Sequence, residues 1–510
     1  MSLIFDKKSK AVIFWLIILF GFVIRLSFFI GNKFPLHDGG FFYVLIEDLL
    51  SNEFSLPVYS SYNNANIPFV YPPFGFYFIG LIETAFSVDR LQLMRIIPLL
   101  VTSLTIPAFY YLALELSKED RVALLATFFY SILPLSYKWL ILGGGITRAF
   151  GALFGILALM FSVKFMRRGK WSLGGLGALF CGLTVLSHPE WAWFLFYSLG
   201  LFIVITLIKR WKKILLRALI ILLGTLIVAL PWLVNIFGDK FFLPLMDSGS
   251  SKWVDIINLL TLNWSGEALI PIITILALVG LAIILRKKEW FLLVWLPVIF
   301  VLQGRGAIQK ATIPLALLAG EGLINVFDYF QAKFSNPLRS NWVKWIAAFL
   351  LVYLLVGNMI PVIGFAQPLS DDELDSIVWI ENSTPVESSF LMISSEEWGS
   401  ENYSEWMVAL SGRQSVSVVQ GYEWLPDFSS RVARYNTIQY EYSRGMADLL
   451  PWLQENNIQV DYMVIPKTVN SGLEVTALGF HWDDVSSFPG VESVYENDGL
   501  LIFDISQVND

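Results

Sequence analysis

Two residues that can do acid–base chemistry, His37 and Asp38, stand together shortly after the first apolar stretch of the chain. An aspartate at the mouth of a pocket can orient or deprotonate a hydroxyl group, so Asp38 is a candidate general base and His37 a second candidate catalytic residue. A structural role fits the same pattern. The apolar side of the residues after Gly40 predicts a helix that lies flat at a membrane surface. Asp38 at its start can accept backbone N–H groups as its N-cap.

A second pair of polar residues, His188 and Glu190, flanks a proline between two further apolar stretches. Such residues are costly at a membrane edge unless they are solvated or used, so Glu190 is a candidate catalytic carboxylate and His188 a candidate substrate ligand. A proline in the first turn of a helix explains the same residues as a structural turn. His37 and His188 each lie near a carboxylate in the sequence, which allows a bound divalent cation, but no zinc-ligand spacing is present. The sequence therefore requires no cofactor and identifies no metal ligand.

Three basic residues stand where apolar stretches begin. Arg148 follows the glycines 143–145, and Arg305 and Lys310 lie in the segment QGRGAIQK. Guanidinium forks match the geometry of phosphate oxygens, so convergence of these side chains on one face would form a phosphate site. Taken singly, each is explained as well by anchoring at a membrane interface. The glycines allow either a close approach of another backbone or a turn with positive φ.

The composition places these residues in a membrane protein. Of the 510 residues, 56% are hydrophobic and only 15% are charged, whereas soluble domains carry about 25% charged residues. The mean hydropathy is +0.62. This composition argues against a soluble enzyme, a disordered chain and a nucleic-acid-binding protein. Residues 368–510 hold 5 basic and 24 acidic side chains, whereas residues 1–367 hold 30 and 18. We therefore expect a basic membrane domain over 1–367 and an acidic soluble domain over 368–510.

Eleven apolar stretches approach the roughly 20 residues with which a helix crosses a bilayer. They lie near 11–31, 92–116, 122–138, 147–165, 172–187, 191–208, 214–236, 268–285, 290–302, 312–326 and 345–365. Five basic clusters separate them, and the positive-inside rule places these in the cytoplasm. The clusters are Lys7–Lys10, Lys164–Lys170, Lys209–Arg217, Arg286–Lys288 and Lys333–Lys344.

An even number of crossings must separate any two cytoplasmic clusters. The proline-led stretch 71–86 is therefore expected to be a re-entrant or juxtamembrane helix rather than a crossing. The expected fold is a polytopic α-helical membrane protein with about 11 transmembrane helices and a C-terminal external α/β domain. Its N-terminus lies in the cytoplasm, and the polar candidates all fall on the external side. We expect a multi-pass protein of the cell membrane.

The residues from 368 onward predict the α/β domain in more detail. SDDE at 370–373 is a capping box, the strand-like runs are FLMIS, SVSVV, DYMVIP and LLIFDI, and GMADLLPWLQEN predicts a helix. Cys181 is the only cysteine, so the tail has no disulfide, which is more typical of a prokaryotic surface than of a eukaryotic secretory lumen. Three acid–aromatic groups in the tail either stack on sugars or, as we favour, are core tryptophans with exposed acids. They are Glu405-Trp406, Glu423-Trp424 and His481-Trp482-Asp483-Asp484.

Two short motifs carry a resemblance to a known superfamily. Asp38-Gly39-Gly40-Phe41-Phe42 follows the first apolar stretch, and Tyr71-Pro72-Pro73-Phe74 comes later in the same external loop. In order and topology, residues 11–320 resemble the GT-C glycosyltransferases, which include protein O-mannosyltransferases, the lipid A aminoarabinose transferase and the oligosaccharyltransferase catalytic subunit. The resemblance implies that Asp38 is the catalytic carboxylate, that the donor is a sugar on a polyprenyl phosphate, and that Arg305 meets the lipid phosphate.

The sequence departs from this pattern at one point. Many relatives carry a second acid shortly after the proline that ends their third span, but no Asp or Glu lies between Pro134 and the next cytoplasmic cluster. Glu190 is the best replacement for it, as a metal ligand or as a group that orients the acceptor.

The expected function is transfer of a sugar from a polyprenyl-phosphate-linked donor to an acceptor hydroxyl. The configuration should invert, because the lipid phosphate leaves from the opposite face. The expected partners are the donor, a glycan, lipid or protein acceptor, and membrane lipids, with no nucleic acid. The candidate catalytic residues are Asp38, His37 and Glu190, and the candidate substrate ligands are Arg148, Arg305, Lys310, His188 and Tyr71. A transporter or flippase, and a non-catalytic surface scaffold, are the alternatives. A transporter would place charges near the middle of the membrane, whereas here they gather at one edge.

Overall fold

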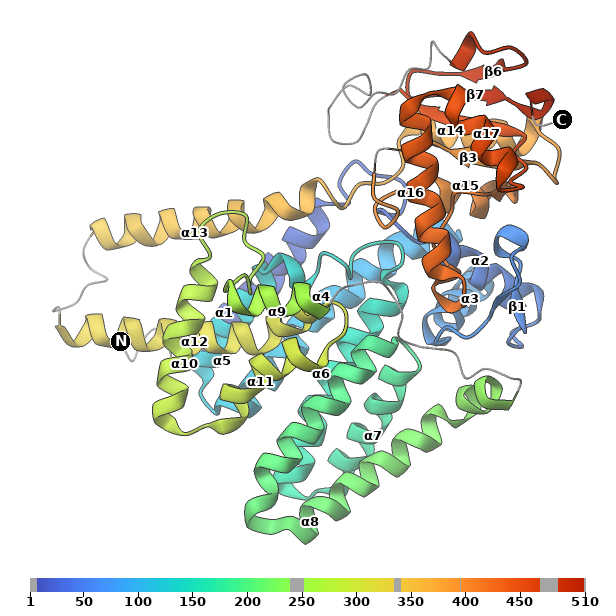
Figure 1. Ribbon diagram of the computed structural model, residues 1–510. Helices are drawn as coiled ribbons and strands as arrows, with labels where there is room; N and C mark the ends of the chain where they lie inside the picture. Colours follow the sequence, from blue (N-terminus) through green and yellow to red (C-terminus); the bar gives the residue numbers. More distant parts are fainter. Residues whose placement is uncertain (1–6, 239–251, 334–340, 395, 468–484, 509–510) are drawn as a thin grey trace.

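The computed structural model describes residues 7–238, 252–333, 341–394, 396–467 and 485–508. An apolar helical body accounts for most of the chain, and a smaller part with a β-sheet lies at one end of it (Figure 1). The helices of the body are α1 (Lys7–Ser27), α2 (Gly40–Ser51), α3 (Phe74–Phe86), α4 (Arg90–Ser117), α5 (Asp120–Ile132), α6 (Gly145–Arg168), α7 (Trp171–Val185), α8 (Pro189–Gly238), α9 (Lys252–Leu260), α10 (Ile272–Lys287), α11 (Trp290–Leu302), α12 (Ala307–Lys333) and α13 (Asn341–Ile363).

Every apolar stretch expected to span the membrane is helical, but the helices differ in length. Within the described residues, seven are long and apolar enough to cross a bilayer: Lys8–Ser27, Arg90–Ser117, Gly145–Arg168, Pro189–Thr206, Trp211–Ile236, Ala307–Lys333 and Lys344–Ile363. The helices α5, α7, α10 and α11 have 13, 15, 16 and 13 residues. These are shorter than the roughly 20 residues of a full crossing. The protein is therefore a multi-span helical membrane protein, and in the described residues seven of the expected spans have the length of a full crossing.

Helix α8 carries two of these candidate spans. The basic stretch 209–217 lies within the helical residues Pro189–Gly238, because lysine, arginine and leucine favour helix. The spans Pro189–Thr206 and Trp211–Ile236 lie on either side of 207–210, where the chain turns back near the α8 label in Figure 1. Two spans, one on either side of this basic cluster, were expected.

Burial separates the inner helices from the outer ones. In the most apolar window of α6, 78% of the residues are buried, compared with 22% in α1, in the second part of α8 and in α13. These outer helices expose large apolar side chains, such as Trp15 at 65%, Ile227 at 72% and Phe349 at 67%. Contiguous exposed apolar surface of this kind marks a face that contacts lipid. The centre of the body is formed by α4, α5, α6 and α12.

The C-terminal part contains a mixed five-stranded sheet. Its strands are β3 (Ser389–Met392), β4 (Gln414–Ser415), β5 (Tyr462–Pro466), β6 (Glu492–Glu496) and β7 (Leu500–Asp504), in the order β4-β3-β5-β7-β6. Strand β3 is parallel to β4 and β5, whereas β7 is antiparallel to β5 and β6. The helices of this part are α14 (Asp371–Ser383), α15 (Tyr403–Ser411), α16 (Phe428–Arg444) and α17 (Met446–Glu455).

The local predictions for the tail are mostly confirmed. The capping box forms, since Ser370 Oγ accepts from the backbone N–H of Glu373 at 3.2 Å and Glu373 accepts from that of Ser370 at 2.7 Å. The run SVSVV is mostly not a strand, because only Ser415 joins β4. The N–H of Val416 still donates to the carbonyl of Phe390 at 2.9 Å. After that, the Ser417 hydroxyl rather than a backbone carbonyl accepts from the N–H of Met392, so a side-chain bond ends the ladder. Strand β6 was not predicted.

The sheet part and the helical body share a buried core. One apolar cluster joins Phe41 and Leu45 of α2 and Phe76 of α3 to Trp406 and Met407 of α15. Helix α2 therefore packs beneath α15, as Figure 1 shows, rather than lying free at a membrane surface as the sequence suggested. A short two-stranded ladder of β1 (Tyr59–Ser60) and β2 (Ile67–Pro68) lies beside it in the same long loop.

Candidate active site

The loop that carries Asp38 is held against the glycine run by backbone hydrogen bonds. The N–H of Gly143 donates to the carbonyl of Leu36 at 2.8 Å, and that of Gly144 donates to the carbonyl of Asp38 at 3.0 Å. A Cβ atom at Gly143 would lie only 2.3 Å from the Asp38 carbonyl oxygen. This position therefore requires glycine because two backbones meet there, which is the first of the two roles that the sequence allowed.

The carboxylate of Asp38 forms an ion pair with Arg148 at the start of α6. Its Oδ1 also accepts from the N–H of Gly144 at 3.2 Å. Burial alone would raise the pKa of Asp38, but the charges of Arg148 and His37, together with the hydrogen bonds from Arg148 and Gly144, outweigh it and hold the pKa below its ordinary value. The side chains of Asp38 and Arg148 keep exposures of 23% and 17%, so the ionised pair is reachable by a substrate.

Asp38 does not cap the helix that follows it. The N-cap of α2 is Gly39, with φ 142°. Because glycine has no side chain, this residue supplies no capping hydrogen bond of its own. The cap comes from the tail: Glu405 accepts from the N–H of Phe41 at 2.9 Å and from that of Gly39 at 3.3 Å. Burial, and after it the charge of Asp38, raise the pKa of Glu405 to about 8. The N-cap interpretation of Asp38 is therefore wrong, because its side chain is turned toward Arg148.

Trp406, the residue after Glu405, also binds the loop that carries Asp38. The indole N–H of Trp406, which is completely buried, donates to the carbonyl of His37 at 2.7 Å. A Cβ atom at Gly40 would meet the backbone carbonyl of Glu405 at 2.6 Å, so the fit between this loop and α15 requires glycine. The backbone around Asp38 is thus fixed by α15.

A second charged cluster gathers three of the predicted residues. Lys310 in the first turns of α12 donates to Glu190 in the first turn of α8 at 2.7 Å, and Arg305 approaches the same carboxylate at 4.0 Å. The Lys310 side chain is only 1% exposed, whereas Arg305 is 47% exposed. The ammonium group of Lys310 also lies 5.5 Å from the centre of the Trp191 ring. Lys310 is therefore fixed, while Arg305 remains free to turn toward a ligand.

Tyr71 and His188 lie between the two clusters. Their rings meet edge to face at 6.3 Å, and Tyr71 also contacts the Trp424 ring of the tail at 5.4 Å. Burial raises the pKa of Tyr71 to about 12, and the charges of Arg148 and Glu190 both act on its hydroxyl. Burial lowers the pKa of His188 to about 3, because the charge of Glu190 only partly opposes it. At neutral pH this pair is therefore a neutral phenol beside a neutral imidazole.

His37 is the predicted site residue whose side chain turns toward an apolar wall. Its ring packs against Phe365 at 4.6 Å and near Trp139 at 6.3 Å, and its exposure is 6%. Burial lowers its pKa. Its main-chain carbonyl, not its ring, receives the hydrogen bond from Trp406.

The donor set around Asp38 does not fit a divalent cation. Of the carboxyl groups at the site, Asp38 faces Arg148, Glu190 faces Lys310, and Glu405 accepts backbone N–H groups. Across the described ranges, no group of three or more His, Cys, Asp or Glu side chains could hold a metal ion.

The sequence did not show that the tail reaches this site. Trp406 is buried as we favoured, but Glu405 is 3% exposed rather than an exposed acid. Burial raises the pKa of Glu423, and the charges of Arg305 and Asp38 both act on it. In the sequence, only the pairing of an acid with an aromatic residue pointed to Glu405 and Glu423. That pairing did not indicate which residues they would contact. His481-Trp482-Asp483-Asp484 lies outside the described residues.

Known proteins share this architecture. Residues 70–234 match the family model described as dolichyl-phosphate-mannose-protein mannosyltransferase. The oligosaccharyltransferase of Archaeoglobus fulgidus, solved with zinc and sulfate, is 16% identical with a TM-score of 0.57, covering 88% of this chain and 68% of that one. ArnT from Cupriavidus metallidurans bound to undecaprenyl phosphate is 13% identical with a TM-score of 0.53, and 98% of each chain is covered.

A third structure extends the likeness to a larger protein. The arabinofuranosyltransferase AftD from Mycobacteria is 12% identical with a TM-score of 0.55; the match covers 99% of this chain and 40% of AftD. No curated protein sequence matches the chain. The chain shares its fold with the oligosaccharyltransferase, ArnT and AftD structures, as the resemblance noted in the sequence implied.

Proposed function

We propose that this protein is a membrane glycosyltransferase that moves a sugar from a polyprenyl-phosphate-linked donor to an acceptor hydroxyl, with inversion. The family match over residues 70–234 and the GT-C fold support the reaction class. The observation that carries the site assignment is the ionised, partly exposed carboxylate of Asp38 beside Arg148, with Lys310 and Arg305 across Tyr71.

Asp38 acts as the base in this proposal. The acceptor oxygen forms a bond to the anomeric carbon, and its proton passes to the Asp38 carboxylate. The bond between the anomeric carbon and the phosphate oxygen breaks, and its electron pair leaves with the lipid phosphate. Attack and departure on opposite faces of the sugar invert the configuration.

The cations stabilise the charge that appears on the departing phosphate. Arg305 has the exposure to move onto a phosphate oxygen, and Lys310, fixed by Glu190, presents a charge at constant position. Arg148 keeps Asp38 ionised through its hydrogen bond to that carboxylate. The neutral Tyr71 hydroxyl donates a hydrogen bond to the phosphate or the sugar, with His188 behind it.

The topology forms part of the proposal. The N-terminus lies in the cytoplasm, Asp38 and the tail lie outside, and residues 1–367 and 368–510 form the membrane and external domains. The short helices α5, α7, α10 and α11 cross as a group of shielded helices to give 11 crossings, while α3 does not cross. A prokaryotic cell surface suits a tail without disulfides.

Replacement of Asp38 by asparagine tests the function. Purified Asp38→Asn protein should lose at least about 100-fold of its transfer from radiolabelled polyprenyl-phosphate sugars, because a positioned base contributes that much. Glu47→Gln is the matched control, since Glu47 is an exposed acid on the helix that follows Asp38. Equal transfer by the wild type and Asp38→Asn would reject the assignment of the base. If the wild type transfers none of a broad panel of such sugars, the transporter and scaffold alternatives replace the enzyme.

A further inference from the structure

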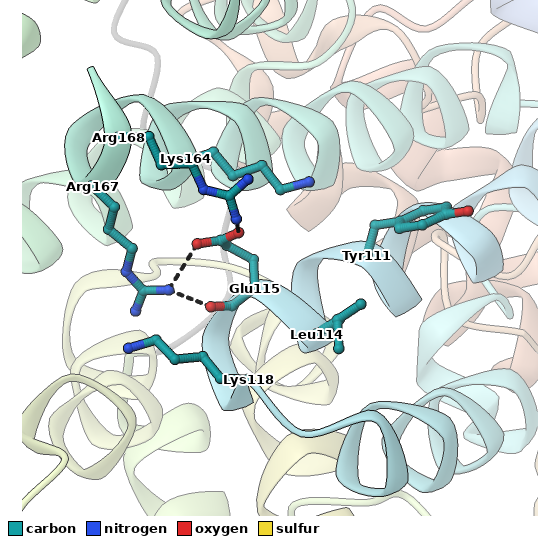
Figure 2. Close-up of a pocket in the computed structure, with 7 residues that line it drawn as sticks. All are labelled: Tyr111, Leu114, Glu115, Lys118, Lys164, Arg167 and Arg168. Atoms are coloured by element: carbon teal, nitrogen blue, oxygen red, sulfur yellow. Dashed lines mark hydrogen bonds and ion pairs between the residues drawn. The ribbon is translucent and has the colours of Figure 1, made fainter. Parts of the chain in front are cut away.

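A separate pocket of about 450 Å³ lies where α4 and α6 end. Figure 2 shows the guanidinium groups of Arg167 and Arg168 on either side of the Glu115 carboxylate. The pocket is lined by Tyr111, Leu114, Glu115, Lys118, Lys164, Arg167 and Arg168.

This pocket is remote from the candidate active site. Helix α6 carries Arg148 near its first residue and Arg168 at its last. Twenty residues at about 1.5 Å per residue place them roughly 30 Å apart, which is the thickness of the hydrocarbon layer. The two sites therefore lie at opposite faces of the membrane body.

The pocket holds more positive charge than its one acid neutralises. Glu115, whose side chain is 6% exposed, pairs with Arg167 at 3.0 Å and Arg168 at 2.5 Å. In the parts of the chain that the structure describes, Lys118 and Lys164 have no carboxylate within ion-pair distance.

Two cations near the pocket each have an acid of their own. Lys10 pairs with Asp120 at 2.5 Å, and Arg121 pairs with Asp328 at 3.0 Å. In the pocket, by contrast, four cations converge around one acid, and an anion is the complement of that excess.

The arginines of the pocket are oriented rather than loosely anchored. Arg167 donates both to the carboxylate and to the backbone carbonyl of Glu115, and Arg168 donates to the other carboxylate oxygen. A buried acid that fixes two guanidinium groups leaves their remaining N–H donors facing outward in a set geometry. Such forks match the oxygen geometry of phosphate, as they match that of carboxylate.

The wall of the pocket indicates what the phosphate is attached to. Leu114 and Tyr111 lie one and two turns before Lys118 on α4, toward the middle of the membrane, and Tyr111 is 48% exposed. A chain that runs along these residues from a phosphate at the basic end would stay in the hydrocarbon layer. We propose that the pocket binds the phosphate headgroup of a lipid in the leaflet opposite Asp38, a site that does not depend on the proposed transfer reaction.

Native mass spectrometry of the detergent-purified protein tests this site. The probe is dioleoyl phosphatidic acid, with dioleoylglycerol as the lipid that lacks phosphate. The double variant Lys164→Gln/Arg168→Gln removes two charges but keeps polar side chains at both positions. We expect it to bind phosphatidic acid at least about 10-fold more weakly than the wild type, since charge-assisted hydrogen bonds are the strong ones. Lys164→Arg should keep the binding.

The control variant also removes two positive charges from the membrane face that holds the pocket. Lys170→Gln/Lys213→Gln alters two exposed lysines that do not line the pocket, and should bind phosphatidic acid as the wild type does. Equal thermal midpoints of the two double variants would show that both are folded. Equal binding by both double variants overturns the proposal, as does binding of dioleoylglycerol at the level of phosphatidic acid. Competition by inorganic phosphate alone, with no lipid bound, would assign the pocket to a soluble phosphate compound and also overturn the lipid.

Discussion

The carboxylate of Glu405 caps the helix that begins beside Asp38, by accepting the backbone N–H of Phe41 at 2.9 Å. Glu405 and Phe41 are 364 positions apart in the chain. The cap is reinforced by Trp406, which bonds the carbonyl of His37. The candidate base therefore owes its position to the tail as much as to the membrane helices around it.

Removal of the Glu405 cap should displace the loop. Glu405→Ala leaves two buried N–H groups without an acceptor, which costs about 1–3 kcal/mol of stability. As a positioning residue, Glu405 should affect kcat for transfer more than the KM of the donor. Glu405→Gln, which keeps an acceptor oxygen, should recover most of kcat. Glu397→Ala, at an exposed acid of the tail, is the control. Unchanged kcat in Glu405→Ala would show that Trp406 alone fixes the loop.

Stability should depend on pH through the same residue. Because the pKa of Glu405 is raised to about 8 in the folded protein, the folded state binds a proton more tightly than the unfolded chain. The contribution is fully present below the ordinary carboxyl pKa and is lost as pH rises toward 8. The thermal midpoint of the wild type should therefore fall relative to that of Glu405→Gln between about pH 5 and pH 8, and the difference should be constant above pH 9. A constant difference across that whole range would contradict the assignment.

Arg148 should control the ionisation of Asp38. Because Arg148 helps to hold the pKa of Asp38 below its ordinary value, Arg148→Ala should raise it. The acid limb of the pH–rate profile should then move to higher pH, and transfer should fall by roughly 10–100-fold through loss of a charged hydrogen bond. Arg148→Lys should return the acid limb of the pH–rate profile to its wild-type position but should not restore the full rate. A lower rate with an unshifted limb would limit Arg148 to a structural role.

Arg305 should act on the donor. Its removal in Arg305→Ala takes away a cation that can reach the phosphate, so use of the polyprenyl-phosphate donor should weaken by roughly 10–100-fold. Arg305→Lys should recover part of the loss, because an ammonium does not reproduce the fork. Arg286→Ala, at an exposed arginine in the last turn of α10, is the control. Equal donor saturation curves for wild type and Arg305→Ala would make Arg305 an interfacial anchor.

Cysteine labelling should fix the topology. With Cys181 replaced by alanine, Val88→Cys and Ser443→Cys should react with a membrane-impermeant maleimide in intact cells. Lys170→Cys should react only after the cells are opened. All three positions lie at the protein surface. Protection of Val88→Cys in intact cells would mean that α3 crosses the membrane.

The elements of the body were predictable because each is encoded locally. Apolar stretches of sufficient length form helices wherever they stand, and the box at Ser370–Glu373 needs only four adjacent residues. The motif at Asp38 likewise identified the loop.

What could not be predicted is the choice of distant partners. Nothing near Asp38 in the chain indicates that Arg148, 110 positions away, would bind its carboxylate, or that Glu405 would take over the N-cap. Lys310 and Glu190 were both identified as candidates, yet their pairing depends on how α8 and α12 pack.

The union of α15 with the Asp38 loop has a consequence for whatever the tail binds. Two segments that move together form one thermodynamic unit, so a ligand that shifts α15 alters the affinity of the loop for its substrate. By reciprocity the substrate alters the affinity of the tail by the same factor. Binding of an acceptor polymer by the tail would then change the affinity for a sugar donor held in the membrane, and the donor would change the affinity for the acceptor. Glu405 is the residue that couples the two sites.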